Sequence, residues 1–235
     1  MVSSDAPPST SSAIHPCLKD ATAFMSRGVP QRLKASDVRK AALLCEESFR
    51  GSSLLSYVFP KAEARDSGVV SMFRIFVKYS MMFGSAQALF DKEGMAGVAC
   101  LHNEESGNSS LSRLLRASGP TGLLQIAAHL PTWSRLNNTE DCLKEARDKH
   151  LGARYLYLDV LAVRPDLQGQ GYGGTLLRHL LTCAGNRSAP VFLETSTESN
   201  IALYRHYGFS VLETCSIAGM SEDIRLMVRP DIQST

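Results

Sequence analysis

The C-terminal half of the chain contains the feature that most constrains its fold, a strand followed by a glycine-rich loop and a helix. Residues 155–163 form an almost unbroken apolar run, which predicts a strand covered on both faces. Four glycines follow within 169–174, and leucines then recur at helical spacing over 176–184. Such a loop lets free backbone N–H groups at the helix start approach a phosphate, so a pyrophosphate-bearing ligand is expected here.

A dinucleotide-binding site is the first alternative for this loop. Gly169, Gly171 and Gly174 satisfy G-x-G-x-x-G, and Glu194 lies where such a protein carries its ribose-binding acid. However, five residues separate the strand from the first glycine, whereas the dinucleotide turn follows its strand directly. The remaining stretch of about 60 residues is also too short for the rest of a doubly wound sheet. The spacing therefore argues against a nicotinamide enzyme.

Composition narrows the class of function. Lys and Arg number 25 and Asp and Glu 23, a net charge of +2, so we expect no nucleic-acid partner. No apolar run reaches the ~18 residues of a membrane span, so we expect no membrane partner. The six cysteines are scattered without a CxxC pair, and the histidines lack metal-ligand spacing. These features predict no disulfide framework, no metal and a reducing, cytoplasmic location.

The expected organisation is a Ser- and Pro-rich disordered tail over residues 1–28 and one domain over 29–235. We predict that Ser36-Asp37 caps a first helix, that Pro131 ends a helix and that Thr139 opens the next one. The expected strands are 31–35, 86–90, 95–101, 155–163, 191–195, 209–217 and 224–228, and the expected helices begin after Ser36-Asp37 and cover 62–82, three short stretches of 103–152, 176–184 and 199–207.

Two motifs resemble those of a known family. The segment 163–174, VRPDLQGQGYGG, resembles motif A of the GNAT acetyltransferases, V-x-P-x-x-Q/R-x-x-G-x-G/A. Downstream, 200–209, NIALYRHYGF, resembles the family's N-x-x-x-Y-x-x-x-G-F segment. Within this superfamily the chain is most similar to the puromycin N-acetyltransferase-like group, through 191–196 and 225–230. The resemblance implies a single GNAT-like α/β (α+β) domain, with a mixed, mostly antiparallel sheet flanked by helices and splayed central strands.

Acetyl-CoA is the co-substrate that the resemblance implies. A splayed strand would offer backbone groups to the pantetheine arm, a glycine loop would hold the pyrophosphate, and an asparagine would line the cofactor on the far side. The positions that match these roles are Leu161, Ala162, Val163, Gln168, Gly169, Gln170, Gly171, Tyr172, Gly173, Gly174, Thr175 and Asn200. Arg164 and Arg205 are further candidates for the phosphates, or else solvated cations.

The catalytic candidates are one tyrosine and two acids. Tyr204 occupies the family's tyrosine position, where it would donate a proton to the leaving thiolate, and Tyr207 is interpreted as a packing residue. Asp159 and Glu194, on neighbouring strands beside the cofactor site, are candidates for the base that deprotonates the amine. Each acid has a structural alternative. For Asp159 it is a hydrogen bond or ion pair with a local arginine such as Arg154. For Glu194 it is a strand-end position near solvent or a cap of the turn at Thr195-Ser196.

The function implied is N-acetylation of a small-molecule amine, by direct attack on acetyl-CoA in a ternary complex. The helices of 103–152 would supply an acceptor wall. Two alternatives stay open: a protein or peptide N-acetyltransferase, and an acyl-CoA-binding sensor without turnover. A monomer and a homodimer are both compatible with the sequence.

Overall fold

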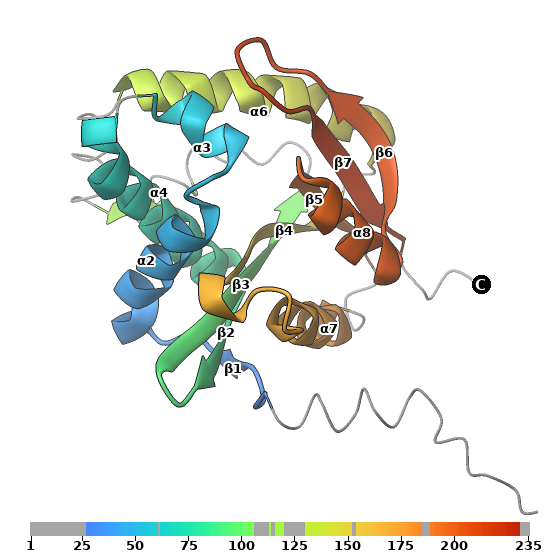
Figure 1. Cartoon of the computed structure of the whole chain (residues 1–235). Helices are drawn as coiled ribbons and strands as arrows, with labels where there is room; N and C mark the ends of the chain where they lie inside the picture. Colours follow the sequence, from blue (N-terminus) through green and yellow to red (C-terminus); the bar gives the residue numbers. More distant parts are fainter. Residues whose placement is uncertain are drawn as a thin grey trace, which may run out of the picture.

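A seven-stranded sheet organises the chain, in the order β1-β2-β3-β4-β5-β7-β6 (Figure 1). The structure is a computed structural model that describes residues 27–60, 62–105, 113, 116–119, 130–151, 154–184 and 189–230. Its strands are β1 (Gln31–Arg32), β2 (Gly84–Asp91), β3 (Gly94–Glu105), β4 (Arg154–Val163), β5 (Val191–Thr195), β6 (Ser210–Cys215) and β7 (Ile224–Arg229). Its helices are η1 (Ala35–Asp37), α2 (Val38–Phe49), α3 (Ser53–Val58), α4 (Ala62–Phe83), α6 (Leu130–His150), η2 (Pro165–Leu167), α7 (Tyr172–Ala184) and α8 (Glu198–His206).

The sheet is mixed and mostly antiparallel, as predicted. Within the described residues, β4 and β5 are its parallel pair, and the remaining neighbours run antiparallel. The β2–β3 hairpin predicted around residues 91–94 is confirmed, with Asp91 paired to Gly94. Asp91 Oδ1 accepts from the backbone amides of Glu93 and Gly94, which closes the turn.

The two central strands separate from one another. β4 and β5 pair only at Leu156 with Val191 and at Tyr157 with Phe192, although β4 continues to Val163. Just beyond this junction the pairing of β4 with β3 shifts by one residue, because Asp159 is an extra residue on β4. A bulge bends its strand and increases the local twist. The predicted splay is therefore present and begins after Tyr157.

Helices cover both faces of the sheet. On one face, α2 and α4 pack in a core that includes Val160 and Ala162 of β4. On the opposite face, α7 and α8 pack on Leu156 and Leu158 of the same strand. This arrangement confirms that β4 is covered on both sides, and the bulge explains why its inward-facing residues change parity between Leu158 and Val160.

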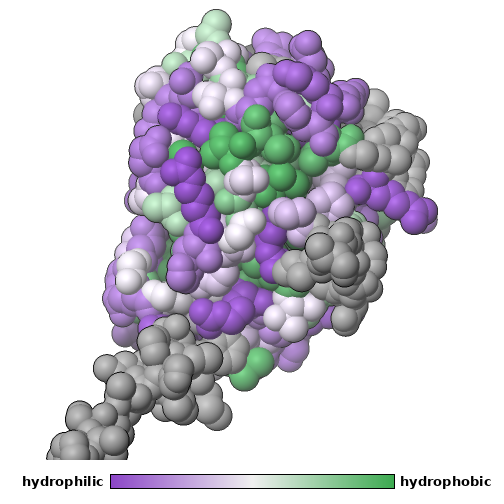
Figure 2. Space-filling view, turned by 90° about the vertical axis from the view of Figure 1, so that its right-hand side faces the viewer, coloured by the Kyte–Doolittle hydropathy of each residue, from purple (hydrophilic) through white to green (hydrophobic). Residues whose placement is uncertain are grey.

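The second end of the sheet is closed by α6. Leu143 and Ala146 of α6 pack on Phe192 and Leu226, on the face that α2 also covers. The strand β6 lies at the sheet edge on the right-hand side of Figure 1, and Figure 2 shows an apolar area bordered by hydrophilic side chains on that side.

The N-terminal elements differ from the prediction in their boundaries. β1 has only two residues, and α2 begins at Val38 after the short helix η1. Asp37 is the residue before α2, but its side chain makes no capping hydrogen bond. The predicted side-chain cap at Ser36-Asp37 is therefore wrong. The sequence analysis also missed α3, a six-residue helix whose start is capped by Ser52.

Two helix boundaries in the middle of the chain were also predicted wrongly. Pro131 lies in the first turn of α6 rather than at the end of a helix, and Thr139 lies in the middle of α6 rather than at a start. Proline is tolerated in a first turn because its missing N–H has no intrahelical partner there. The Thr139 hydroxyl donates to the Arg135 carbonyl at 3.1 Å, a bond that threonine forms inside helices.

Part of the predicted organisation concerns residues that the structure does not describe. Residues 1–26 of the predicted tail and most of the two helices predicted between 111 and 130 lie outside the described residues. In the described part, no helix is both long and apolar enough to cross a membrane.

Candidate active site

The site begins as an opening between β4 and β5. Because the strands pair only at their junction, the backbone of β4 from Asp159 to Val163 has no partner in β5. Leu161, Ala162 and Val163 lie on this stretch, where the sequence had placed the pantetheine contacts. A free strand edge of this kind presents N–H and C=O groups that a ligand with amide groups can bind.

Beyond the end of β4, the chain forms the glycine loop. Gly169 and Gly171 have φ values of 71° and 85°, in the left-handed region that favours glycine. Thr175 N–H donates to the Gly171 carbonyl at 3.0 Å and so begins the intrahelical bonding of α7. The amides of Gly169, Gly171, Tyr172, Gly173 and Gly174 make no backbone hydrogen bond within the described residues. Such a set of amides at a helix start, where the dipole is positive, is suited to an anion.

The side chains of the loop have structural partners. Gln168 Nε2 donates to the Val163 carbonyl at 3.1 Å, and Gln170 Nε2 donates to the Asp166 carbonyl at 2.6 Å. The Thr175 hydroxyl donates to the Gly171 carbonyl at 3.1 Å. These bonds stabilise the shape of the loop, so its backbone amides rather than its glutamine amides are presented to a ligand.

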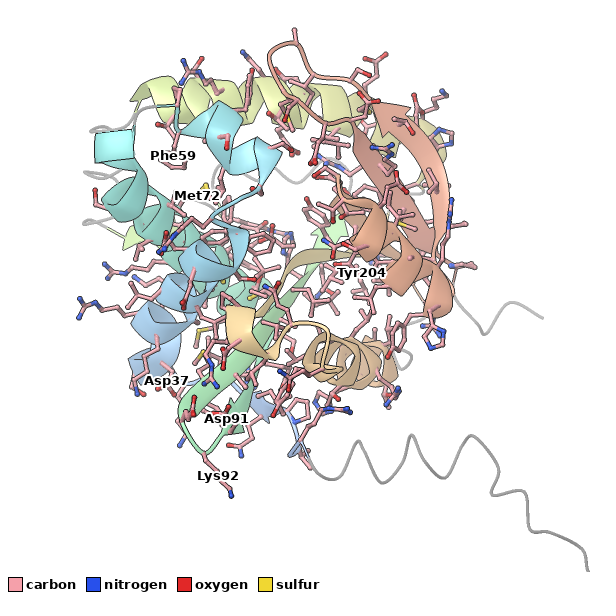
Figure 3. All side chains as sticks on the ribbon, viewed as in Figure 1. Asp37, Phe59, Met72, Asp91, Lys92 and Tyr204 are labelled. Carbon is pink, nitrogen blue, oxygen red and sulfur yellow. The ribbon has the colours of Figure 1, made fainter. Side chains whose placement is uncertain are left out.

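Arg164, a candidate for the phosphates, is engaged elsewhere. Its guanidinium contacts the carboxylates of Asp91, Glu93 and Asp166 at 2.7 to 2.9 Å. These ion pairs connect the end of β4 to the β2–β3 hairpin (Asp91 is labelled in Figure 3). The structure therefore gives Arg164 a structural role, and three carboxylates already balance its charge. Arg205 is exposed near the end of α8.

Glu194 lies in a buried polar network at the junction of β4 and β5. Its Oε1 accepts from Arg147 Nη1 at 2.8 Å, and its Oε2 accepts from the Tyr157 hydroxyl at 2.9 Å. Arg147 also pairs with Glu140 on α6. The Glu194 side chain is only 14% exposed, so the predicted alternative of a strand-end residue near solvent is wrong.

This environment changes the acidity of Glu194. Burial raises its pKa, while the Arg147 charge and the Tyr157 hydrogen bond lower it, and the net result is a pKa of about 7. The rise comes from desolvation of the carboxylate, which burial disfavours relative to the neutral acid. A carboxylate with a pKa near the working pH is suited to accept a proton.

Asp159, the second candidate base, is the bulge residue of β4. It is half-buried, and its negative charge raises the pKa of the buried thiols of Cys45 and Cys100, although burial is the larger cause for each. Asp159 thus faces the side of the sheet covered by α2, the same side as Tyr157 and Glu194. The structure brings both candidate acids to one face, near the point where β4 and β5 separate.

Tyr204 lies on the opposite face of the opening. Its ring packs in the core that also contains Leu158 of β4 and Leu193 of β5, with Phe209 at a centroid distance of 5.6 Å. Figure 3 shows Tyr204 on the side of α8 that faces the two strands. Burial raises the pKa of its hydroxyl, so the phenol keeps its proton at neutral pH.

Asn200 lies in the first turn of α8, directly after the open end of β5. The backbone N–H of Asn200 donates to the Thr197 carbonyl at 3.1 Å. Thr197 precedes the helix, and its hydroxyl is buried without a hydrogen-bond partner in the described part of the chain. The helix start beside the opening therefore has a polar group available for a ligand.

Sequence reasoning missed Arg147 and Tyr157, the two partners of Glu194. Tyr157 was assigned only to a strand, and Arg147 lies on a helix without any motif. Arg147 follows Leu143 and Ala146, two buried residues of α6, at helical spacing. This spacing is the sequence signal that would have placed Arg147 on the buried side of the helix. Tyr207 packs against Gly174 and accepts a hydrogen bond from Arg178 at 3.3 Å, as expected of a packing residue.

The described residues contain no group of three or more His, Cys, Asp or Glu side chains that could hold a metal ion. Cys45, Cys100 and Cys183 are free thiols.

One family model matches part of the chain. Residues 139–211, which include β4, the glycine loop, α7, β5 and α8, match the family model of the acetyltransferase (GNAT) domain. A search of curated proteins found no match.

Solved structures share the fold. A histone acetyltransferase HPA2-related protein from Corynebacterium glutamicum is 18% identical, with a TM-score of 0.63 over 88% of this chain and 98% of its own. The polyamine N-acetyltransferase of Drosophila melanogaster, which forms N-acetylagmatine, is 15% identical, with a TM-score of 0.58 over 85% and 98%. Arylalkylamine N-acetyltransferase 2 from Aedes aegypti is 10% identical, with a TM-score of 0.59 over 86% and 97%.

Residues 139–211 thus match the model of the GNAT acetyltransferase domain, and the described residues have the GNAT fold. The fold follows from the solved structures, and the family model covers residues 139–211, less than half of the chain.

Proposed function

We propose that this protein transfers the acetyl group of acetyl-CoA to the amine of a small molecule, by direct attack in a ternary complex. The observation that carries the proposal is the position of Glu194. A carboxylate with a pKa of about 7 lies where β4 and β5 separate, within hydrogen-bond distance of Tyr157 and Arg147. The shared fold of the polyamine and arylalkylamine enzymes supports a small amine as acceptor.

The residues present fit acetyl-CoA. The free amides of the glycine loop suit its pyrophosphate, and the unpaired edge of β4 suits the amide groups of its pantetheine arm. Leu161, Ala162 and Val163 would hold this arm, and Asn200 would line the far side. When bound, acetyl-CoA supplies the acyl group and the thiol leaving group.

Glu194 is the base in this proposal. An amine arrives largely as an ammonium ion, and Glu194 accepts the proton that blocks attack, which leaves a neutral nitrogen to form the C–N bond. Burial raises the pKa of Glu194 to about 7, so both the carboxylate and the neutral acid are accessible near neutral pH. Asp159 is the alternative base. It lies on the same face of the sheet as Glu194, at the start of the part of β4 that does not pair with β5.

Tyr204 is the proton donor. As the C–S bond breaks, its hydroxyl gives a proton to the leaving thiolate, and the proton released from the amine nitrogen replaces it. The buried phenol stays protonated at neutral pH because burial raises its pKa. The overall reaction converts an ammonium and a thioester into an amide, a free thiol and one released proton.

The decisive experiment is a thiol-release assay with the purified full chain and acetyl-CoA. The acceptor panel contains agmatine, a polyamine, an arylalkylamine and short peptides with a free N-terminus or a lysine. We expect turnover with at least one small amine and a much lower kcat/KM for each peptide. Faster acetylation of a peptide would establish the protein or peptide alternative instead.

Calorimetry separates the remaining alternative. Binding of acetyl-CoA without turnover of any acceptor would support an acyl-CoA sensor, and absence of binding would overturn the proposal. We also propose that the chain belongs to the puromycin N-acetyltransferase-like subgroup and that the protein is cytoplasmic. Cys45 and Cys100 are buried thiols that form no disulfide, which supports a reducing compartment.

A further inference from the structure

Three segments that are far apart in the sequence meet at the carboxylate of Glu222. The Ser53 hydroxyl, on α3, donates to Glu222 Oε2 at 3.0 Å, and the Ser196 hydroxyl, just after β5, donates to the same oxygen at 2.8 Å. The two hydroxyl oxygens are 3.5 Å apart. Because Glu222 lies in the connection between β6 and β7, these bonds join that connection to α3 and to the end of β5.

The register of the sheet places this carboxylate on the same face as Glu194. Successive side chains of a strand point to opposite faces, so Ser196 follows Glu194 on one face of the sheet. On β7, Leu226 lies opposite Glu194 and packs with Ile224 in the core beside α6, and Glu222 follows them at the same period of two residues. Two residues of extended chain span roughly 7 Å. The Glu222 carboxylate, in contact with Ser196, therefore lies about one such step beyond the proposed base, away from the junction of β4 and β5.

Glu222 has no positively charged partner in the described part of the chain. No Lys, Arg or His side chain there forms an ion pair with it, and no donor there reaches its Oε1. Arg225, the nearest arginine along the chain, pairs with Glu198 at 3.2 Å instead.

The carboxylate is both held in position and accessible. Glu222 is exposed, so a ligand can reach Oε1 while Ser53 and Ser196 hold Oε2. A side chain that is already fixed in one position loses less conformational entropy when a ligand binds. A carboxylate forms its strongest hydrogen bonds with charged donors, such as an ammonium or a guanidinium.

We propose that the acceptor is a small molecule with two cationic groups, and that Glu222 binds the group that does not react. Glu194 takes the proton from the reacting ammonium, while Glu222 Oε1 accepts hydrogen bonds from the second cation. Ser53 and Ser196 are positioning residues, because they act on the substrate only through this carboxylate. The inference rests on the proposed function and deepens it, because it names the substrate class: a diamine or an aminoguanidine rather than a monoamine.

Steady-state kinetics of the full chain with putrescine and pentylamine test this inference. Pentylamine has a methyl group in place of the second ammonium of putrescine, so the pair isolates the second charge. We expect kcat/KM of the wild-type chain to be about fivefold higher for putrescine, through a lower KM, the effect of one exposed ion pair. The preference should shrink as salt is added, because salt screens exposed charges.

The Glu222→Gln variant keeps the shape of the side chain and removes its charge. We expect its KM for putrescine to rise about fivefold, with kcat changed less than about twofold and with wild-type kinetics for pentylamine. Asp223→Asn is the matched control. It removes the same charge from the next residue, which is also exposed and whose carboxylate already accepts from the Ser216 hydroxyl at 2.6 Å, and it should keep the wild-type KM for both amines. Thermal melting checks that both variants are folded.

Equal kcat/KM for the two amines in the wild-type chain would overturn the inference, whether or not the variants fold. An equal loss for both amines in Glu222→Gln would also overturn it, because a structural role affects both substrates alike. Acetylation of peptides alone would exclude a small dication as the acceptor. Turnover of monoamines without a preference for the second charge would overturn only this inference, whereas a wild-type chain that binds no acetyl-CoA would overturn the proposed function itself.

Discussion

Tyr157 and Glu194 are joined by a hydrogen bond across the junction of β4 and β5, with the Tyr157 hydroxyl donating to Glu194 Oε2 at 2.9 Å. The strands pair at Tyr157 and Phe192 and then separate, so this bond lies at the inner end of the opening between them. Arg147 donates to the other carboxylate oxygen at 2.8 Å. The protonation of Glu194 is therefore coupled to two neighbours at the point where the proposed chemistry takes place.

The Tyr157→Phe variant should move the acid limb of the pH–rate profile to higher pH. The Tyr157 hydrogen bond lowers the pKa of Glu194, so its removal raises that pKa and leaves less carboxylate at neutral pH. We expect kcat/KM to fall near pH 7 and to approach the wild-type value near pH 9. A profile measured from about pH 5 to about pH 9 checks this. An inflection at the wild-type position would contradict the assignment of Glu194, and Tyr207→Phe is the control.

The Glu194→Gln variant should lose most of its turnover. An amide does not accept the ammonium proton, and removal of a general base typically costs ~10²-fold or more in rate. We expect kcat at neutral pH to fall by about that factor, with a smaller deficit at high pH, where free amine is abundant. The control Glu145→Gln, at an exposed position on α6, should keep wild-type kcat. If Glu194→Gln is fully active and Asp159→Asn is not, Asp159 is the base.

Glu194 also predicts how stability depends on pH. Its pKa in the folded chain, about 7, is above its usual value of 4.5, so the folded state holds the proton more tightly than the unfolded state. The contribution to the unfolding free energy is fully present below the usual pKa and is lost as the pH rises through about 7. Urea unfolding at several pH values should therefore show a smaller decline between about pH 5 and about pH 8 in Glu194→Gln. Equal declines in both proteins would show that burial does not perturb this carboxyl.

The Tyr204→Phe variant should separate chemistry from binding. The ring packs with Phe209 and the hydroxyl forms no hydrogen bond with the described residues, so the fold should tolerate the change. We expect kcat to fall ~10²-fold, the effect of losing a positioned acid, with the Kd of acetyl-CoA changed less than about twofold. Single-turnover kinetics and calorimetry provide the two readouts. Wild-type kcat across the pH range would remove Tyr204 from the mechanism.

Gly174 provides a test of the packing between α7 and Tyr207. A Cβ at position 174 would overlap the Tyr207 hydroxyl, but would lie 3.4 Å from ring atom Cζ. Gly174→Ala alone should lower the unfolding free energy by ~1–3 kcal/mol, as overpacking does. In a Tyr207→Phe background the overlap is removed, and alanine should instead stabilise the helix by up to ~1 kcal/mol.

Urea unfolding of the four proteins in this cycle measures the coupling between the two positions. A change of sign between the two backgrounds is the expected result. Equal effects of Gly174→Ala in both backgrounds would mean that the Tyr207 hydroxyl does not limit the space at this position.

The elements with continuous patterns were predicted well. β4, the glycine loop and α7 follow from an apolar run, four clustered glycines and a leucine stripe, all of which are local signals. The errors lie where the signal is ambiguous: Pro131 is compatible with both a helix start and a helix end, and the short α3 has too few residues for a periodic pattern.

The sequence by itself determined the class of fold and the place of the phosphate loop, because glycine conformation and hydrophobic periodicity act on neighbouring residues. Only the tertiary structure decided which charges are paired. It placed Arg147 on Glu194, 47 residues away, and engaged Arg164 with the β2–β3 hairpin. These pairings depend on how helices and strands dock, and a pKa depends on burial and on partners that come from distant segments.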